Sequence, residues 1–196
     1  MTEAKFLPAA QRVTTPWKNG GGSTAEVIVY PPDADFTSFL WRLSIATVAT
    51  PGPFSHFAGI DRTLAVIAGD IALTIDGAPA IRIDERAAPV DFSGEAPVDG
   101  TPVGGPVMDL NAMVQRGHFA AEMIALSGGE TLESDGDTLV IVALAPLTLS
   151  HQGKTVALER LDAFAASAGP IGVAASGAGR NGFAVRFIRQ GNLAQS

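Results

Sequence analysis

The 196-residue sequence contains no cysteine, and this absence excludes several classes of site. Without thiols the chain can form no disulfide framework, thiolate zinc site or iron–sulfur cluster, and it has no cysteine nucleophile. The three histidines stand singly, so the sequence lacks the His-x-His pair that a metal-binding β-roll carries. We therefore expect neither a metal nor another cofactor.

Positive charge is also scarce. Lys and Arg number 13 against 20 Asp and Glu, which gives a net charge of −7, and only three of the basic residues are lysines. We therefore expect neither nucleic acid nor a membrane surface as a partner. In an acidic protein, an arginine that lies among apolar residues usually binds a specific anion.

Long apolar runs are absent as well. The longest, residues 139–149, contains Pro146, and a membrane span takes about 20 residues. The start of the chain lacks a charged segment followed by an apolar one, as a secretory signal would have. We expect a soluble, cytoplasmic protein.

The sequence is rich in turn formers, with 22 glycines and 13 prolines. Short apolar runs between turn dipeptides predict many short strands and hence an all-β sandwich or barrel. The predicted strands are 25–30, 40–48, 63–68, 71–75, 80–83, 107–114, 118–127, 138–145, 147–150, 155–158 and 183–188. Residues 161–168, followed by Gly169, are the one weak helical segment.

An internal similarity refines this prediction. Residues 63–83 resemble residues 138–158, at an offset of about 75 residues with a one-residue slip. Two copies of a β-roll, each closing its own sheet, would explain both the length and the strand count. The alternative is coincidence, because apolar hairpins resemble one another.

Four segments carry polar residues that a purely structural β-protein does not need. In the first, Trp17, Lys18 and Asn19 precede three consecutive glycines. The glycines would allow close approach to a phosphate, but the P-loop spacing is missing. A flexible turn before a strand is the simpler interpretation.

The second segment is a predicted strand around Arg42. Its alternation places Arg42 and Ser44 on one face and Trp41 and Leu43 on the other. If both faces are enclosed, Arg42 needs a carboxylate or a ligand. Otherwise Arg42 lies on a solvated face.

The third segment is a loop with His56 that leads to Arg62 at the start of a strand. A lone histidine makes no metal site, and Ser55, His56 and Asp61 lack the nucleophile-elbow context of a catalytic triad. We therefore place His56 at the rim and Arg62 at the mouth of the predicted roll.

The fourth segment alternates Asp109, Asn111 and Met113 onto one face of a strand. Asn111 offers donors and an acceptor for a small ligand. Alternatively, Asp109 and Asn111 satisfy only local backbone groups.

In this order and spacing, the four segments resemble the HutD/Ves family. The resemblance is carried by Pro16-Trp-Lys-Asn-Gly-Gly-Gly with Thr24 and Glu26, by Trp41-Arg-Leu-Ser-Ile-Ala, by Gly52-Pro-Phe-Ser through Gly59 and Arg62, and by Phe92-Ser-Gly-Glu leading to Asp109-Leu-Asn-Ala-Met. It extends from about Arg12 to Ile188 and is diffuse beyond Arg116. Ala58 stands where the family usually has proline, which loosens the loop before Arg62.

The resemblance implies an all-β fold, a double cupin-like β-roll (bicupin) with antiparallel sheets and little helix. An N-terminal lobe over residues 1–115 would carry the pocket, and residues 116–196 would form the C-terminal lobe. It further implies the absence of a catalytic metal and an association with histidine utilisation, where a regulatory role through binding a pathway intermediate has been proposed.

The leading hypothesis is metal-independent binding of a small carboxylate, with urocanate and N-formylglutamate as candidates by family analogy. Arginine grips a carboxylate through paired, charge-assisted hydrogen bonds. The predicted ligand-binding residues are three cations and four neutral residues that shape the pocket: Lys18, Arg42 and Arg62, with Trp17, Asn19, Ser44 and Asn111.

Two alternatives remain open. One is a metal-free enzyme on the same pocket, an isomerase or amide hydrolase, with Glu26 or His56 as general base. The other is an interaction protein without a small ligand, in which Arg42 and Arg62 pair with Glu26 or Asp109 and leave no cavity. Small β-rolls often form homodimers through exposed sheet faces, but no sequence feature decides the oligomeric state.

Overall fold

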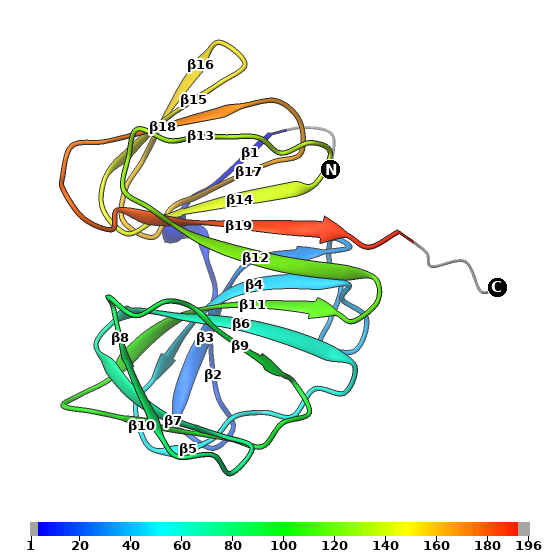
Figure 1. Ribbon diagram of the computed structural model, residues 1–196, viewed down its shortest axis with the longest axis vertical. Coiled ribbons are helices and arrows are strands. Elements are labelled where there is room, and N and C mark those ends of the chain that lie inside the picture. Colours follow the sequence, from blue (N-terminus) through cyan, green and yellow to red (C-terminus); the bar gives the residue numbers. More distant parts are fainter. Residues whose placement is uncertain (1–3, 192–196) are drawn as a thin grey trace. The chain divides into compact units, whose positions relative to one another are not determined.

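The computed structural model describes residues 4–191 and confirms the predicted all-β fold (Figure 1). Helix within that range is limited to one 3-10 turn, η1 (Ala9–Gln11). The described chain divides into two compact units, which we call the N-terminal roll (residues 13–120 and 190–191) and the C-terminal roll (residues 4–12 and 121–189). The expected division lay at residue 115. The chain instead changes unit after Ala120, and its first segment belongs to the C-terminal roll.

The N-terminal roll consists of two antiparallel sheets, blue to green in Figure 1. The six-stranded sheet runs β2 (Thr14–Pro16), β3 (Gly22–Tyr30), β4 (Trp41–Val48), β11 (Val107–Gln115), β6 (Ile60–Ala68) and β9 (Val90–Ser93). The four-stranded sheet runs β5 (Gly52–Pro53), β10 (Val98–Pro102), β7 (Asp70–Ile75) and β8 (Ile81–Asp84). Val66 and Val107 from the first sheet pack against Leu73 and Val98 from the second, so the core lies between the sheets.

The C-terminal roll has the same construction. Its five-stranded sheet runs β1 (Lys5–Leu7), β17 (Ala163–Ala166), β14 (Thr138–Ala143), β19 (Gly182–Arg189) and β12 (Phe119–Leu126). Its four-stranded sheet runs β13 (Thr131–Leu132), β18 (Ile171–Ala175), β15 (Leu147–His151) and β16 (Lys154–Leu158). Leu139, Ile141, Leu149 and Ile171 fill the space between these sheets.

The sheet orders confirm the predicted duplication. The eight consecutive strands β4 to β11 recur as β12 to β19, with each strand in the equivalent place of its sheet. The two similar sequence segments correspond to β6–β8 and β14–β16. The double cupin-like roll is therefore two copies of one eight-stranded pattern, to which β2 and β3 are added in one copy and β1 in the other.

The eleven predicted strands all form, with ends shifted by up to about three residues. The predicted helix over 161–168 is wrong. Residues Ala163–Ala166 instead form β17, which pairs with β1 on one side and β14 on the other. Two flanking strands that satisfy the backbone override the weak helical preference of a short alanine-rich segment.

Strands β4 and β11 lie at the centre of the six-stranded sheet and position the polar residues. Every side chain from Trp41 to Ala46 is buried, so both faces of β4 are enclosed.

The helical content of residues 4–191 includes no segment long and apolar enough to cross a membrane.

Candidate functional site

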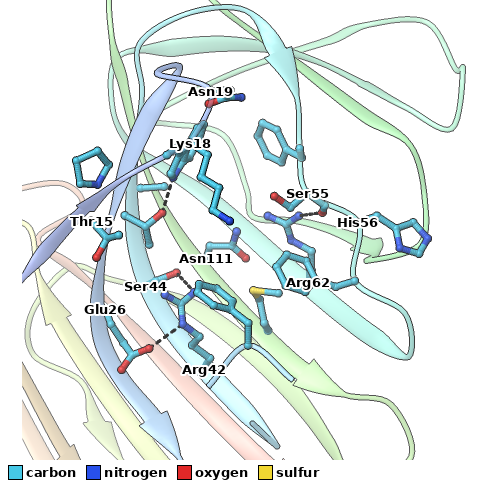
Figure 2. A pocket seen from close by; sticks show the side chains of 18 of the residues that line it. Thr15, Lys18, Asn19, Glu26, Arg42, Ser44, Ser55, His56, Arg62 and Asn111 are labelled. Atoms are coloured by element: carbon cyan, nitrogen blue, oxygen red, sulfur yellow. Dashed lines mark hydrogen bonds and ion pairs between the residues drawn. The ribbon is translucent and has the colours of Figure 1, made fainter. Parts of the chain in front are cut away.

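A cavity of about 830 Å³ opens in the N-terminal roll (Figure 2). The structure brings all seven predicted ligand-binding residues to this cavity: Trp17, Lys18, Asn19, Arg42, Ser44, Arg62 and Asn111. Other lining residues include Thr15, Thr24, Glu26, Phe36, Phe54, Ser55, His56, Phe57 and Met113. In Figure 2, the side chains of Lys18, Arg42 and Arg62 extend toward the same space as Asn111.

Strand register explains why residues distant in sequence converge here. Met113 on β11 lies opposite Arg42 on β4 and opposite Arg62 on β6. Two residues along, Asn111 lies opposite Ser44. Because alternate residues of a strand share one face, these five side chains project into the interior of the roll.

Arg42 is a buried cation with a partner. Only 7% of the residue is exposed; its Nε donates to Glu26 Oε2 at 2.9 Å and its Nη1 donates to Ser44 Oγ at 3.2 Å. The guanidinium also lies over the Phe36 ring, 4.7 Å from its centroid. The interpretation of Arg42 as a residue on a solvated face is wrong, and its requirement for a carboxylate is met by Glu26.

Arg62 is equally buried, at 7% exposure, but it is neutralised differently. Its guanidinium lies over Phe54, Phe57 and Phe92, at 5.3, 5.9 and 4.9 Å from the ring centroids. Its Nη1 donates a long hydrogen bond to the Ser55 carbonyl, at 3.4 Å, and its Nε has no partner.

No ion pair joins Arg62 to a carboxylate among the described residues. Burial lowers the pKa of Arg62 to about 10, which leaves the side chain charged at neutral pH. The aromatic faces attract this charge but cannot replace a counter-ion. Arg62 is therefore a cation with unused capacity to bind an anion.

Asn111 and Asp109 are buried acceptors on the same strand face. The Oδ1 atoms of both residues are buried without a hydrogen-bond partner. The interpretation that they satisfy only local backbone groups does not account for these two atoms. Burial raises the pKa of Asp109 to about 7, although the charge of Arg62 opposes the rise.

The glycine run forms the turn between β2 and β3. The Gly20 amide donates to the Trp17 carbonyl at 3.0 Å, and the Gly21 amide donates to Asn19 Oδ1 at 3.0 Å. These amides are therefore used within the turn, as the simpler interpretation expected, and not for a phosphate. The turn places Trp17 in the cavity wall, where its Nε1 donates to Thr24 Oγ1 at 2.8 Å.

The loop before Arg62 is anchored despite Ala58. The Phe57 amide donates to the Gly94 carbonyl at 2.8 Å, and the Gly59 amide donates to Glu95 Oε1 at 2.7 Å. Hydrogen bonds from Arg116 in particular hold the pKa of Glu95 well below its usual value. Glu95 therefore fastens the loop directly through the Gly59 amide.

His56 lies exposed at the rim, and Figure 2 shows its ring directed away from Arg62. Residues 4–191 contain no group of three His, Asp or Glu side chains that could hold a metal ion. The interior face presents Arg42 and Arg62, which are hydrogen-bond donors and not ligands for a cation. The residues present therefore do not fit a metal site.

The sequence did not single out the aromatic residues around the two arginines. Phe36 comes from the loop between β3 and β4 and Phe54 and Phe57 from the loop before β6, and Phe36 stacks on Phe57 with 6.1 Å between the ring centroids. The close spacing of Phe54 and Phe57 around His56 was the available signal. The alternative of an interaction protein without a small ligand predicts that both arginines pair with carboxylates and that no cavity forms. Only the pairing of Arg42 agrees with this alternative.

Comparisons with known proteins agree with the fold and the motifs. The HutD family model matches residues 9–182. The chain is 35% identical over 161 residues to an uncharacterized 21.2 kDa protein in the hutC 3′ region of Pseudomonas putida, covering 80% of this chain and 82% of that protein. It is 33% identical over 120 residues to Protein Ves of Cronobacter sakazakii, covering 61% and 65% of the two chains.

Solved structures agree as well. HutD from Pseudomonas fluorescens SBW25 superposes with a TM-score of 0.83 at 27% identity, covering 96% of this chain and 100% of that chain. A cupin 2 conserved barrel protein from Leptotrichia buccalis, at 12% identity and a TM-score of 0.56, covers 93% of this chain and 99% of its own, and it supports the cupin-like fold alone. The chain therefore belongs to the HutD family, as its four polar segments indicated.

Proposed function

We propose that the N-terminal roll binds a small carboxylate in its cavity without a metal ion, and that this binding has a regulatory role in histidine utilisation. The observation that carries the proposal is Arg62, a buried guanidinium at the cavity with no carboxylate paired to it among the described residues. A buried charge without a counter-ion is costly. An anionic ligand would remove that cost.

The size and chemistry of the cavity suit such a ligand. A volume of about 830 Å³ lies within the range of small-molecule pockets, roughly 300–1,000 Å³. Lys18 adds a second positive charge, and Asn111 Oδ1 is free to accept a hydrogen bond from an N–H group. Urocanate and N-formylglutamate each combine a carboxylate with an N–H donor.

The link to histidine utilisation comes from relatives. The Pseudomonas putida relative is named after its position beside hutC, and the family model is HutD. A regulatory role is favoured over turnover because the two predicted bases are badly placed. Glu26 already accepts a hydrogen bond from Arg42, and His56 lies at the exposed rim.

Thermal unfolding with candidate ligands tests the proposal. Ligand at about 100 times its dissociation constant adds about 2.7 kcal/mol, and each kcal/mol raises the melting temperature by roughly 2–4 °C for this chain length. We expect urocanate or N-formylglutamate to raise the melting temperature by about 5–10 °C, equally with and without EDTA. No shift with any carboxylate contradicts the proposal.

A matched pair of variants tests the role of Arg62. Hydrogen bonds to a charged group contribute about 1.5–3 kcal/mol, so Arg62→Gln should weaken binding of the responding ligand by roughly ten- to a hundredfold in calorimetry. Arg82→Gln removes an exposed arginine of the same roll that pairs with Asp70, and it should leave binding unchanged. Chemical change of the ligand during incubation would favour the enzyme alternative.

A further inference from the structure

Asp109 does not itself line the cavity of the N-terminal roll but is buried just beyond the residues that do. It faces the interior from β11, two residues from Asn111. Its neighbours across the sheet are Ala46 on β4 and Val66 on β6. Two residues further along, Val107 already belongs to the hydrophobic core. Asp109 therefore marks the boundary between the polar cavity and the apolar interior.

The Asp109 carboxylate lacks the hydrogen-bond donors that a buried carboxylate usually has. Asp109 is 2% exposed, and its Oδ1 has no hydrogen-bond partner. Asp162, a buried carboxylate of the C-terminal roll, shows the usual arrangement, because it accepts hydrogen bonds from the amides of Ala9 and Glu159. Without such donors, the ionised form of Asp109 depends on a nearby positive charge.

The charged groups around Asp109 come from several elements. Arg62 reaches the interior from β6, and it is the group whose charge stabilises ionised Asp109. Arg42 reaches it from β4, but its charge is engaged by Glu26 from β3. Lys18 and His56 lie in the loops that line the cavity. Arg62 is therefore the cation that can interact both with ionised Asp109 and with an anion in the cavity.

We propose that a carboxylate ligand and ionised Asp109 compete for the charge of Arg62, so that the cavity takes up its anion together with one proton, which Asp109 holds. This inference rests on the proposed function. The proton comes from solvent and bonds to a carboxylate oxygen of Asp109, while no bond of the ligand changes. For the one carboxylate group that lies at Arg62, the net charge of Arg62, Asp109 and that group equals the net charge of Arg62 and ionised Asp109 before binding.

The sign of the pH dependence follows from linkage. The ligand binds better to the form in which Asp109 is neutral, so binding raises the proton occupancy of Asp109. Burial already brings the pKa of this group to about 7 in the free protein. Affinity should therefore be constant at acidic pH and fall as the pH rises above 7.

Calorimetry with N-formylglutamate at pH 5.5–8.5 tests this inference. This probe has no group that titrates in that range, whereas the imidazole of urocanate does. We expect binding to weaken on the order of thirtyfold between pH 5.5 and 8.5. Titrations in two buffers of different ionisation enthalpy should show uptake of nearly one proton per ligand above pH 7.5.

Three variants test whether Asp109 is the group that takes up the proton. Asp109→Asn mimics the neutral form and should bind the probe with little pH dependence. Asp99→Asn makes the same change at an exposed position of β10 and should keep the wild-type slope. His56→Gln removes the histidine at the rim of the cavity and should also keep the slope.

The outcomes are distinguishable. Binding of N-formylglutamate without proton uptake or pH dependence overturns this inference and leaves the proposed function standing, as does a slope that disappears in His56→Gln. Failure of both N-formylglutamate and urocanate to bind at any pH overturns both this inference and the proposed function. The wild-type proton count needs no variant, so the inference stays testable if Asp109→Asn does not fold.

Discussion

At the scale of single residues, the N-terminal roll contains three buried charged groups that are neutralised in different ways. Arg42 has a carboxylate partner in Glu26, whereas Arg62 has aromatic rings and one long hydrogen bond. Asp109 has only the charge of Arg62. The two buried charges that lack a paired ion lower the stability of the free protein. A bound ligand can restore part of that stability.

We expect Asp109→Asn to stabilise the free protein at neutral pH. Burial raises the pKa of folded Asp109 to about 7, whereas an unfolded carboxyl titrates near 3.9. Between these values the folded state binds more protons, so this group lowers the free energy of unfolding as the pH rises, and the loss is complete above pH 7. The variant should exceed wild type by about 1–4 kcal/mol at pH 8 and by much less at pH 4.

Urea unfolding at pH 4, 6 and 8 measures this difference, with Asp99→Asn as the control that should show none. A difference between Asp109→Asn and wild type that does not change with pH would mean that Asp109 is not held neutral by burial.

At the scale of elements, two loops set the walls of the cavity. The turn between β2 and β3 carries Trp17 and Lys18, and the loop before β6 carries Phe54 and Phe57. Each is fastened by backbone hydrogen bonds, from Trp17 N to Gly22 O at 2.9 Å in the first and from Phe57 N to Gly94 O at 2.8 Å in the second. The cavity is therefore largely formed before a ligand arrives.

Gly22→Ala should destabilise the protein and disturb the cavity wall. A Cβ at this position would lie 2.2 Å from the Thr47 carbonyl oxygen and 2.9 Å from the Trp17 ring. Overpacking of this kind costs about 1–3 kcal/mol. Chemical unfolding followed by Trp fluorescence measures the loss. Gly52→Ala, whose Cβ would meet nothing within 4 Å, is the control and should stay within about 0.5 kcal/mol of wild type.

At the scale of the whole molecule, one strand pattern has been used twice with different interiors. In the N-terminal roll the central strands carry Arg42, Arg62 and Asn111 on the interior face. In the C-terminal roll, Ala184 on β19 pairs with Ile141 just as Asp109 on β11 pairs with Val66, and Ala184 belongs to an apolar core. Duplication therefore supplied two similar folds, and the proposed ligand binding concerns the first.

Residues 4–12 are part of the C-terminal roll, and Asp162 fastens this segment there. Asp162 accepts hydrogen bonds from the amides of Ala9 and Glu159, at 2.7 and 3.0 Å. Asp162→Ala should cost about 1–3 kcal/mol because it leaves these amides without a partner. Hydrogen exchange should accelerate at Ala9 and in β1, and Glu122→Ala, at an exposed position of β12, should change neither. Unchanged exchange at Ala9 would contradict this anchoring role.

Much of the architecture could be predicted from the sequence because its signals are local. Alternation of apolar and polar residues around Arg42 and Asn111 placed them on strands, and turn dipeptides such as Asp76-Gly77 separated the hairpins. The short strands β5, β10 and β18 are among those that escaped prediction, since two to five residues with glycine or proline carry little periodic signal. Segment 161–168 was misassigned because its partners β1 and β14 are far away in sequence.

The sequence by itself predicted that the chain is all-β, indicated a duplication, showed the resemblance to the HutD/Ves family and predicted the seven residues that line one cavity. Only the tertiary structure decided which charges are satisfied. Whether Arg42 meets Glu26, whether Arg62 is enclosed by rings in place of carboxylates, and whether Asp109 finds a donor all depend on strand register and loop packing. The physical reason is that burial and pairing are properties of three-dimensional neighbours, which the spacing of residues along a strand does not specify.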